Sequence, residues 1–192
     1  KEIMDDNTLL VVVDTNKPSI TQCEDLLYMA KMIVVLDHHR QGSDTIRNSV
    51  LSYIEPYASS ASEMVAEILQ YFTEGIRIRN VEADSIYAGI MIDTDNFMQK
   101  TGVRTFEAAA YLRRAGAESS DVKRLFQSSF DQYMERQKLI SSARNCGQGV
   151  IFAITGEQVD RIAAAQAADE LLSIIGTTAS VVAFRSGEND MA

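Results

Sequence analysis

Two short apolar runs constrain the fold of this chain more than any other feature of its sequence. Residues 9–13 read Leu-Leu-Val-Val-Val, and residues 32–36 read Met-Ile-Val-Val-Leu. Continuous runs of this kind are typical of strands that are buried on both faces of a parallel sheet. Pro18 and Ser19 begin a helix between the runs, which we expect over about residues 20–31. The pattern therefore predicts a βαβ unit with a parallel sheet.

Acidic residues and histidines follow both runs. The first run ends at Asp14, and the second ends at Asp37, which is followed by His38 and His39, the two histidines of the whole chain. In parallel α/β sheets, ligands bind beyond the carboxyl ends of the strands. Imidazole and carboxylate together suit manganese, iron or zinc. The pattern by itself leaves a metal site and a polar surface loop as alternatives.

Further along the chain the apolar spacing becomes helical. The stretch from Ser60 to Glu63 has the spacing of a capping box and begins an amphipathic helix. Further helices are expected over residues 81–92, over residues 105–112 with an end at Gly116, after a cap at residues 119–121, and over the polar stretch 130–144. The rest of the chain is expected to form a strand over 150–155, a helix over 159–175 and a strand over 179–184. The fold class is α/β, a parallel sheet flanked by helices followed by part of a smaller α/β domain.

Asp93 directly follows the expected helix over residues 81–92. A carboxylate at the end of a helix is unfavourable for the helix dipole, so a bound cation would compensate it. The alternative is a solvated loop acid beside Asp95.

Charge and composition narrow the partners. The net charge of −9 repels phosphate backbones, which argues against duplex nucleic acid as a partner. Cys23 and Cys146 lack the paired spacing of a zinc site and fit a reducing cytoplasm. No apolar run reaches the roughly 20 residues that cross a bilayer, so we expect no membrane contact from this segment.

Three motifs arrive in an order that resembles a known family. Val-Val-Asp-Thr at 12–15, Asp-His-His-Arg at 37–40 and Gly-Ile-Met-Ile-Asp-Thr-Asp-Asn-Phe at 89–97 resemble motifs two, three and four of the DHH phosphoesterases. Residues 59–63 and 100–109 are similar to the membrane-anchored cyclic di-AMP phosphodiesterases of that family, and less similar to its oligoribonucleases.

The same resemblance implies how the chain is divided. We expect a DHH phosphoesterase domain over residues 1–128 and a helical connector over 129–148. Residues 149–192 resemble the beginning of the DHH-associated C-terminal domain.

The resemblance also implies a site with two manganese ions. In it Asp14 bridges both ions, while His38 and Asp93 complete the shell of the second. His39 faces the substrate phosphate as a catalytic residue. Asp37 orients the histidines from behind, as carboxylates commonly do for metal-bound imidazole.

Arg104 is a further candidate for a phosphate contact. It lies in the Gly-Val-Arg-Thr stretch, and a guanidinium matches phosphate oxygens in pairs. The alternative is a surface arginine at the start of a helix.

The implied reaction opens cyclic di-AMP to the linear dinucleotide pApA. Two divalent cations roughly 3.5 to 4 Å apart activate a shared water and neutralise the phosphoryl oxygens. Two alternatives stay open: an oligoribonuclease or adenosine bisphosphate phosphatase of the same family, and a nucleotide-binding module without turnover. The expected setting is a cytoplasmic domain of a protein anchored in the bacterial cell membrane, with a homodimer as one possible assembly.

The sequence departs from the family in one respect that bears on activity. The family's first motif, an Asp-x-Asp on an earlier strand, does not precede Asp14. We therefore interpret the chain as a piece of a longer polypeptide, and we expect these 192 residues alone to bind manganese weakly and to turn over little cyclic dinucleotide.

Overall fold

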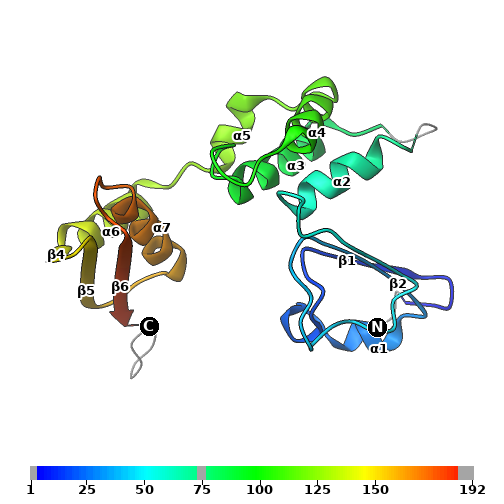
Figure 1. Cartoon of the computed structure of the whole chain (residues 1–192), viewed down its shortest axis with the longest axis horizontal. Coiled ribbons are helices and arrows are strands. Elements are labelled where there is room, and N and C mark those ends of the chain that lie inside the picture. The colour runs from blue at the N-terminus through cyan, green and yellow to red at the C-terminus, as the bar shows by residue number, and fades with distance from the viewer. Residues whose placement is uncertain (1–3, 73–76, 186–192) are drawn as a thin grey trace. The chain divides into compact units, whose positions relative to one another are not determined.

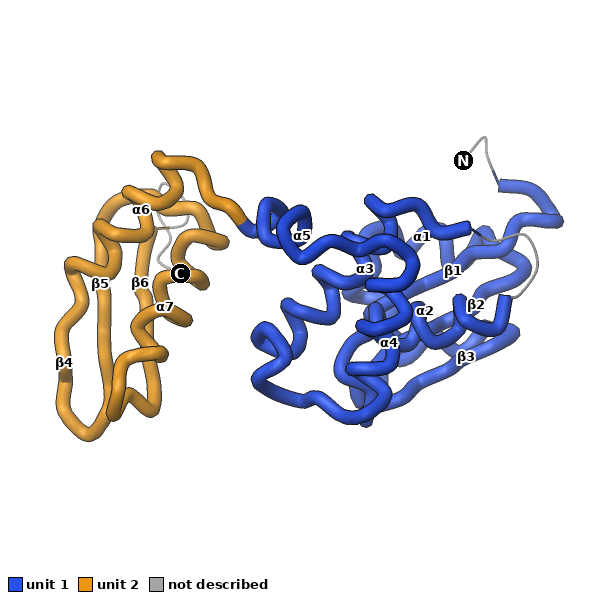
Figure 2. Tube along the Cα trace, turned by 90° about the horizontal axis from the view of Figure 1, so that it is seen from above, with its two compact units in different colours: residues 1–126 blue, residues 127–192 orange. Residues whose placement is uncertain are grey.

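The structure, a computed structural model, describes residues 4–72 and 77–185. The chain forms two compact units, residues 1–126 and residues 127–192, which Figure 2 colours separately. Each unit contains its own sheet. The segment expected as a connector, residues 129–148, contributes a helix and a strand to the second unit.

The sheet of the first unit is parallel. Its described strands are β1 (Leu9–Val13), β2 (Met32–Asp37) and β3 (Leu51–Ile54), in the order β1-β2-β3 (Figure 2). The expected parallel pairing of the first two strands is confirmed. The third was not foreseen, because its four residues are too few to show a period. Leu36 pairs with both Val13 and Tyr53, so the three strands end at one edge.

The described residues bury one face of this sheet and cover the other only in part, where Leu36 is 8% exposed. On the buried face Ile33 and Val35 pack against Leu27 and Ile46. On the other face the side chains of β1 are about half exposed, with Leu9 at 50% and Val13 at 50%. The expectation that this strand is buried on both faces is therefore wrong for the described structure, in which β1 is an outer strand.

The prediction of one helix over residues 20–31 is wrong in the length of that helix. The structure has a short 3-10 turn, η1 (Pro18–Ile20), and a five-residue helix, α1 (Asp25–Met29). Thr21 is extended between them, with ψ 143°. β-Branched residues such as Ile20 and Thr21 disfavour continuation of a helix, which accounts for the break.

Four helices pack together as the second layer of this unit (Figure 1). They are α2 (Ala61–Leu69), α3 (Asn80–Asp93), α4 (Val103–Arg114) and α5 (Ser119–Leu125). Their shared core is built largely from alanine, with Ile90 and Leu112 as its large buried members. Gly89 allows α3 to approach α2 closely, because a Cβ there would lie against the Ser62 side chain.

The ends of these helices match the sequence in part. Ser60 caps α2, since its Oγ accepts from Glu63 N at 2.9 Å. The Glu63 carboxylate accepts a hydrogen bond from the neighbouring Ser59 Oγ, at 2.5 Å. Gly116 has φ +110°, as expected after a helix. The cap of α5 is Glu118, whereas the serines expected to cap it lie inside its first turn.

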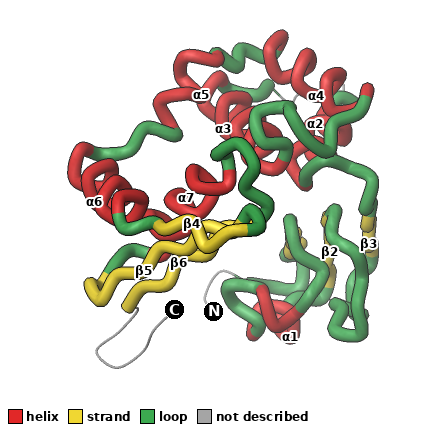
Figure 3. The backbone as a smooth tube through the Cα atoms, turned by 60° about the vertical axis from the view of Figure 1, so that its left-hand side comes forward, coloured by secondary structure: helices red, strands yellow, loops and turns green. Residues whose placement is uncertain are grey.

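The second unit is a smaller two-layer α/β arrangement, with one layer of helices on one sheet. It contains α6 (Phe130–Ser141), β4 (Arg144–Gly147), β5 (Val150–Gln158), α7 (Arg161–Leu172) and β6 (Ala179–Arg185). β5 and β6 are parallel, β4 is antiparallel to β5, and α6 and α7 lie on one face of this sheet (Figure 3). β4 was not foreseen. It joins β5 in a β-hairpin whose turn, at Gly147, Gln148 and Gly149, has positive φ throughout.

Among the residues that the structure describes, no helix combines the length and the apolar character that crossing a bilayer requires.

Candidate metal centre

Asp14 stands at the point where β1 ends. Its backbone is left-handed, with φ +63°, a conformation that aspartate tolerates better than most residues. Its N–H still donates to Leu36 O at 3.0 Å, so the residue remains tied to β2. The turn after the strand therefore occurs at Asp14 itself, next to the end of the neighbouring strand.

His38 follows the last residue of β2 and faces Asp14. Its side chain is only 13% exposed. Its Nε2 lies 3.4 Å from Asp14 Oδ1 and 3.9 Å from Asp93 Oδ2. One imidazole thus stands between two carboxylates that are 79 residues apart in the sequence, from 14 to 93.

Asp93 is the last residue of α3. Burial raises the pKa of its carboxyl group above the ordinary value, the His38 imidazole opposes this, and the Asp14 carboxylate adds to it. The loop that follows is held in place by Thr94, whose buried Oγ1 donates to Ile90 O and accepts from Phe97 N. The helix end and the structured loop together fix where Asp93 lies.

Asp37 is fully buried behind His39. Its Oδ1 accepts from the His39 backbone N at 3.1 Å and from His39 Nδ1 at 2.8 Å. The resemblance implied that this carboxylate orients both histidines, whereas within the described residues it has hydrogen bonds to His39 and none to His38. Asn16, which the sequence analysis missed, donates from Nδ2 to Asp37 Oδ2 at 2.5 Å.

Within residues 4–72 and 77–185, Asp14, His38 and His39 form a group of side chains that could hold a metal ion. Their ligand atoms lie within 4.8 Å of one another. Asp93 lies slightly further out and reaches the group through His38. Asp14 and Asp93 also line one cleft of about 300 Å³, between the end of β1 and helices α2 and α3. Carboxylate oxygens and imidazole nitrogens in one place are a donor set that fits manganese, iron or zinc.

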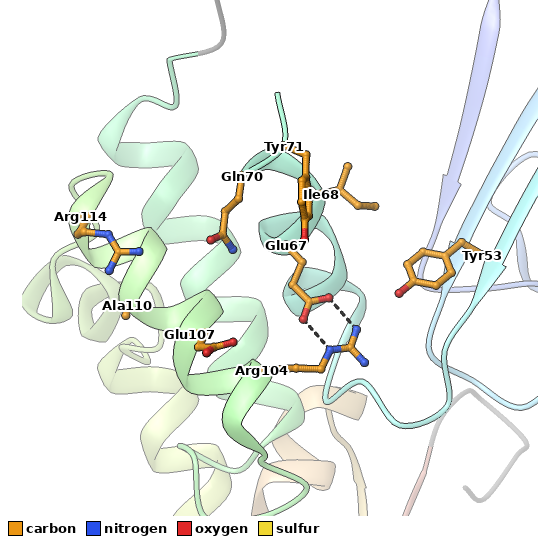
Figure 4. Close-up of a pocket in the computed structure, with 9 residues that line it drawn as sticks. All are labelled: Tyr53, Glu67, Ile68, Gln70, Tyr71, Arg104, Glu107, Ala110 and Arg114. Atoms are coloured by element: carbon orange, nitrogen blue, oxygen red, sulfur yellow. Dashed lines mark hydrogen bonds and ion pairs between the residues drawn. The ribbon is translucent and has the colours of Figure 1, made fainter. Parts of the chain in front are cut away.

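Arg104 has other partners. Figure 4 shows it in a pocket of about 840 Å³ between α2, α4 and β3, where its Nε and Nη2 donate to the Glu67 carboxylate, each at 2.7 Å. Its Nη1 lies 3.6 Å from Glu55 Oε2. The hydrogen bonds to Glu67 hold the pKa of Arg104 above its ordinary value. The structure therefore brings Asp14, His38, His39 and Asp93 together, and pairs Arg104 with carboxylates instead.

A parallel sheet whose carboxyl edge carries imidazoles and carboxylates defines an α/β protein with a candidate centre for a divalent cation. Comparison with known proteins then gives the family. Residues 1–90 match the DHH family, N-terminal domain. This part of the chain therefore belongs to the DHH family.

Individual relatives extend the match along the chain. It is 43% identical over 189 residues to "Cyclic-di-AMP phosphodiesterase GdpP" of Geobacillus thermodenitrificans, covering 97% of this chain and 29% of the relative. It is 42% identical over 191 residues to the Bacillus subtilis protein of the same name, with the same coverage of 97% and 29%. The chain thus spans less than a third of the length of these relatives.

A solved structure shares the fold. It is an exopolyphosphatase-related protein from Bacteroides fragilis, with a TM-score of 0.82 and 17% identity, covering 95% of this chain and 56% of that one. At this identity the likeness concerns the arrangement of the elements. The expected fold class, a parallel sheet flanked by helices and followed by part of a smaller α/β domain, is confirmed.

Proposed function

We propose that this chain is the hydrolytic part of a cyclic di-AMP phosphodiesterase, which opens the cyclic dinucleotide to pApA. One observation carries the proposal: His38 Nε2 lies 3.4 Å from Asp14 and 3.9 Å from Asp93, at the carboxyl edge of a parallel sheet. The names of the relatives that match 97% of the chain support the choice of substrate.

Asp14, His38 and Asp93 would hold manganese in this proposal. Two carboxylates share one imidazole, and this concentration of negative charge favours a divalent cation. A cation bound there supplies Lewis-acid activation of water and neutralises charge on the phosphoryl oxygens. His39 is half exposed, so its ring can meet a phosphate group that enters from solvent. Asp37 holds that ring from the buried side.

The setting proposed for the whole protein is a cytoplasmic catalytic region of a membrane-anchored bacterial enzyme that acts on a cyclic dinucleotide, with a homodimer as its assembly. Arg104 keeps a proposed role in phosphate binding only if substrate displaces Glu67, since the two compete for the same guanidinium N–H groups.

The test is a hydrolysis panel with manganese present. Cyclic di-AMP, pApA and short RNA are each incubated with the protein and the products are separated by chromatography. We expect the whole protein to open cyclic di-AMP to pApA, and the 192-residue chain alone to turn over little of it. Preference of the whole protein for pApA or RNA would instead support the oligoribonuclease alternative. We expect His38→Ala to abolish turnover and to weaken manganese binding by at least about tenfold, while the circular dichroism spectrum is unchanged.

Asp95→Asn is the matched control for Asp93→Asn. Both variants lose one negative charge at the C-terminal end of α3 or just after it, but only Asp93 of the two lies within 4 Å of His38. We expect Asp93→Asn to lose metal affinity and Asp95→Asn to retain it. Equal effects of the two substitutions, or unchanged turnover in His38→Ala, would contradict the proposed ligands.

A further inference from the structure

A buried side chain stands behind the histidine pair, outside the ligand set. Asn16 is 2% exposed and lies two residues after Asp14, in the loop that follows β1. Its Nδ2 donates to Asp37 Oδ2 at 2.5 Å and to His39 O at 3.3 Å. It therefore contacts both the buried carboxylate and the backbone of the residue that this carboxylate holds.

The orientation of the Asn16 amide follows from chemistry. A carboxylate oxygen only accepts hydrogen bonds, so the group facing Asp37 has to be the amide NH₂. This leaves Asn16 Oδ1 buried without a hydrogen-bond partner among the described residues. A buried polar atom without a partner is unfavourable and usually has a reason. The reason here is the donor that Asn16 presents to Asp37.

The hydrogen bonds of Asp37 also determine which ring nitrogen of His39 carries the hydrogen. Asp37 Oδ2 is occupied by Asn16, so its Oδ1 is the oxygen left for His39 N and Nδ1. Because Asp37 accepts, His39 Nδ1 carries the hydrogen, and Nε2 is the ring nitrogen left for a ligand. The ring is thereby set in one tautomer and one orientation.

We propose that Asn16 is a positioning residue that fixes the tautomer and orientation of His39 through Asp37. The functional role of an oriented His39 ring rests on the proposed hydrolysis of a phosphodiester. The hydrogen bonds from Asn16 to Asp37 and from Asp37 to His39 can be tested without measuring turnover. Asn16 is not a catalytic residue, since its side-chain hydrogen bonds go to Asp37 and to the backbone of His39.

The test is nitrogen NMR of the metal-free 192-residue chain with labelled histidine, at a pH where imidazole is neutral. The chain has two histidines, so the signals are assigned with one variant, His38→Gln. We expect wild-type His39 to show the Nδ1–H tautomer, and Asn16→Ala to shift its signals toward those of a free imidazole mixture. Asn48→Ala is the matched control, because it removes another side-chain amide bond of the same unit, Asn48 Nδ2 to Leu27 O. We expect it to leave His39 unchanged.

Three results would overturn the proposal. These are an Nε2–H tautomer in the wild type, an unchanged His39 spectrum in a folded Asn16→Ala chain, or the same shift in Asn48→Ala. If Asn16→Ala does not fold, the wild type decides: the Nδ2 protons of Asn16 should exchange with solvent more slowly than those of exposed Asn145, and equal exchange rates would overturn the role. Absence of cyclic di-AMP hydrolysis by the whole protein would refute the proposed function, and the NMR result for Asn16 could still be interpreted.

Discussion

Asp14 has to satisfy a backbone requirement and a chemical one. Its φ of +63° places the chain in the left-handed region, and its carboxylate faces His38 at 3.4 Å. Non-glycine residues in this region are uncommon and gather at functional sites. The position therefore favours a short polar side chain for conformational reasons as well as a carboxylate for binding.

Substitutions at Asp14 separate these two requirements. We expect Asp14→Ala to be less stable to urea than Asp14→Gly by about 1 kcal/mol, because alanine resists positive φ and glycine does not. Neither variant should bind manganese. Thr15, whose φ is not positive, is the control: there the glycine variant should be the less stable one. An alanine variant as stable as the glycine variant at position 14 would mean that the backbone is not left-handed.

At the scale of elements, Arg104 joins α4 to α2 and approaches β3. Arg104 lies in the first turn of α4, and its hydrogen-bonding partner Glu67 belongs to α2. Glu55, whose carboxylate it also approaches, directly follows β3. Two parallel hydrogen bonds to one carboxylate give this ion pair a defined geometry. Its exposure limits what the pair contributes, since solvent screens charges at a surface.

A double-mutant cycle with Arg104→Gln and Glu67→Gln measures that coupling. We expect a coupling free energy of unfolding of about 1 kcal/mol, at the upper end for exposed pairs because both hydrogen bonds are short. The same variants address the phosphate question. If Arg104 only forms the ion pair with Glu67, both single variants should bind cyclic di-AMP as the wild type does. Weaker binding in Arg104→Gln alone would support a contact between Arg104 and a substrate phosphate.

At the scale of the whole molecule, the candidate ligands belong to one unit. Asp14, His38, His39 and Asp93 all lie within residues 1–126, and the second unit has its own core around Leu139 and Ala167. A ligand that binds only the folded state stabilises the part of the chain that must stay folded to bind it.

Hydrogen exchange followed by mass spectrometry tests this division. At a manganese concentration ten times its dissociation constant, peptides of the first unit that contain β1, β2 and the end of α3 should gain about 1.4 kcal/mol of protection. Peptides from residues 127–185 should show no change, and the His38→Ala chain should show none anywhere. Protection of the second unit alone would move the metal site away from the carboxyl edge of the first sheet.

Local sequence patterns were sufficient for part of this picture. The apolar runs before Asp14 and Asp37 located two parallel strands, the Ser60 cap located α2, and the position of Asp93 after a helical segment located the end of α3. These features depend on neighbours within a few residues, and their periods are visible in the chain. The association of both histidines with Asp14 followed from the rule that parallel strands end at one edge.

Tertiary contacts decided the rest. The short strand β3 exists because β2 offers it a hydrogen-bonding edge, and the burial of Asn16 depends on Asp37, 21 residues away. The pairing of Arg104 with Glu67 spans 37 residues. A single polar residue looks the same in a sequence whether it is solvated or buried against a distant partner, because its environment is set by segments that meet only when the chain folds.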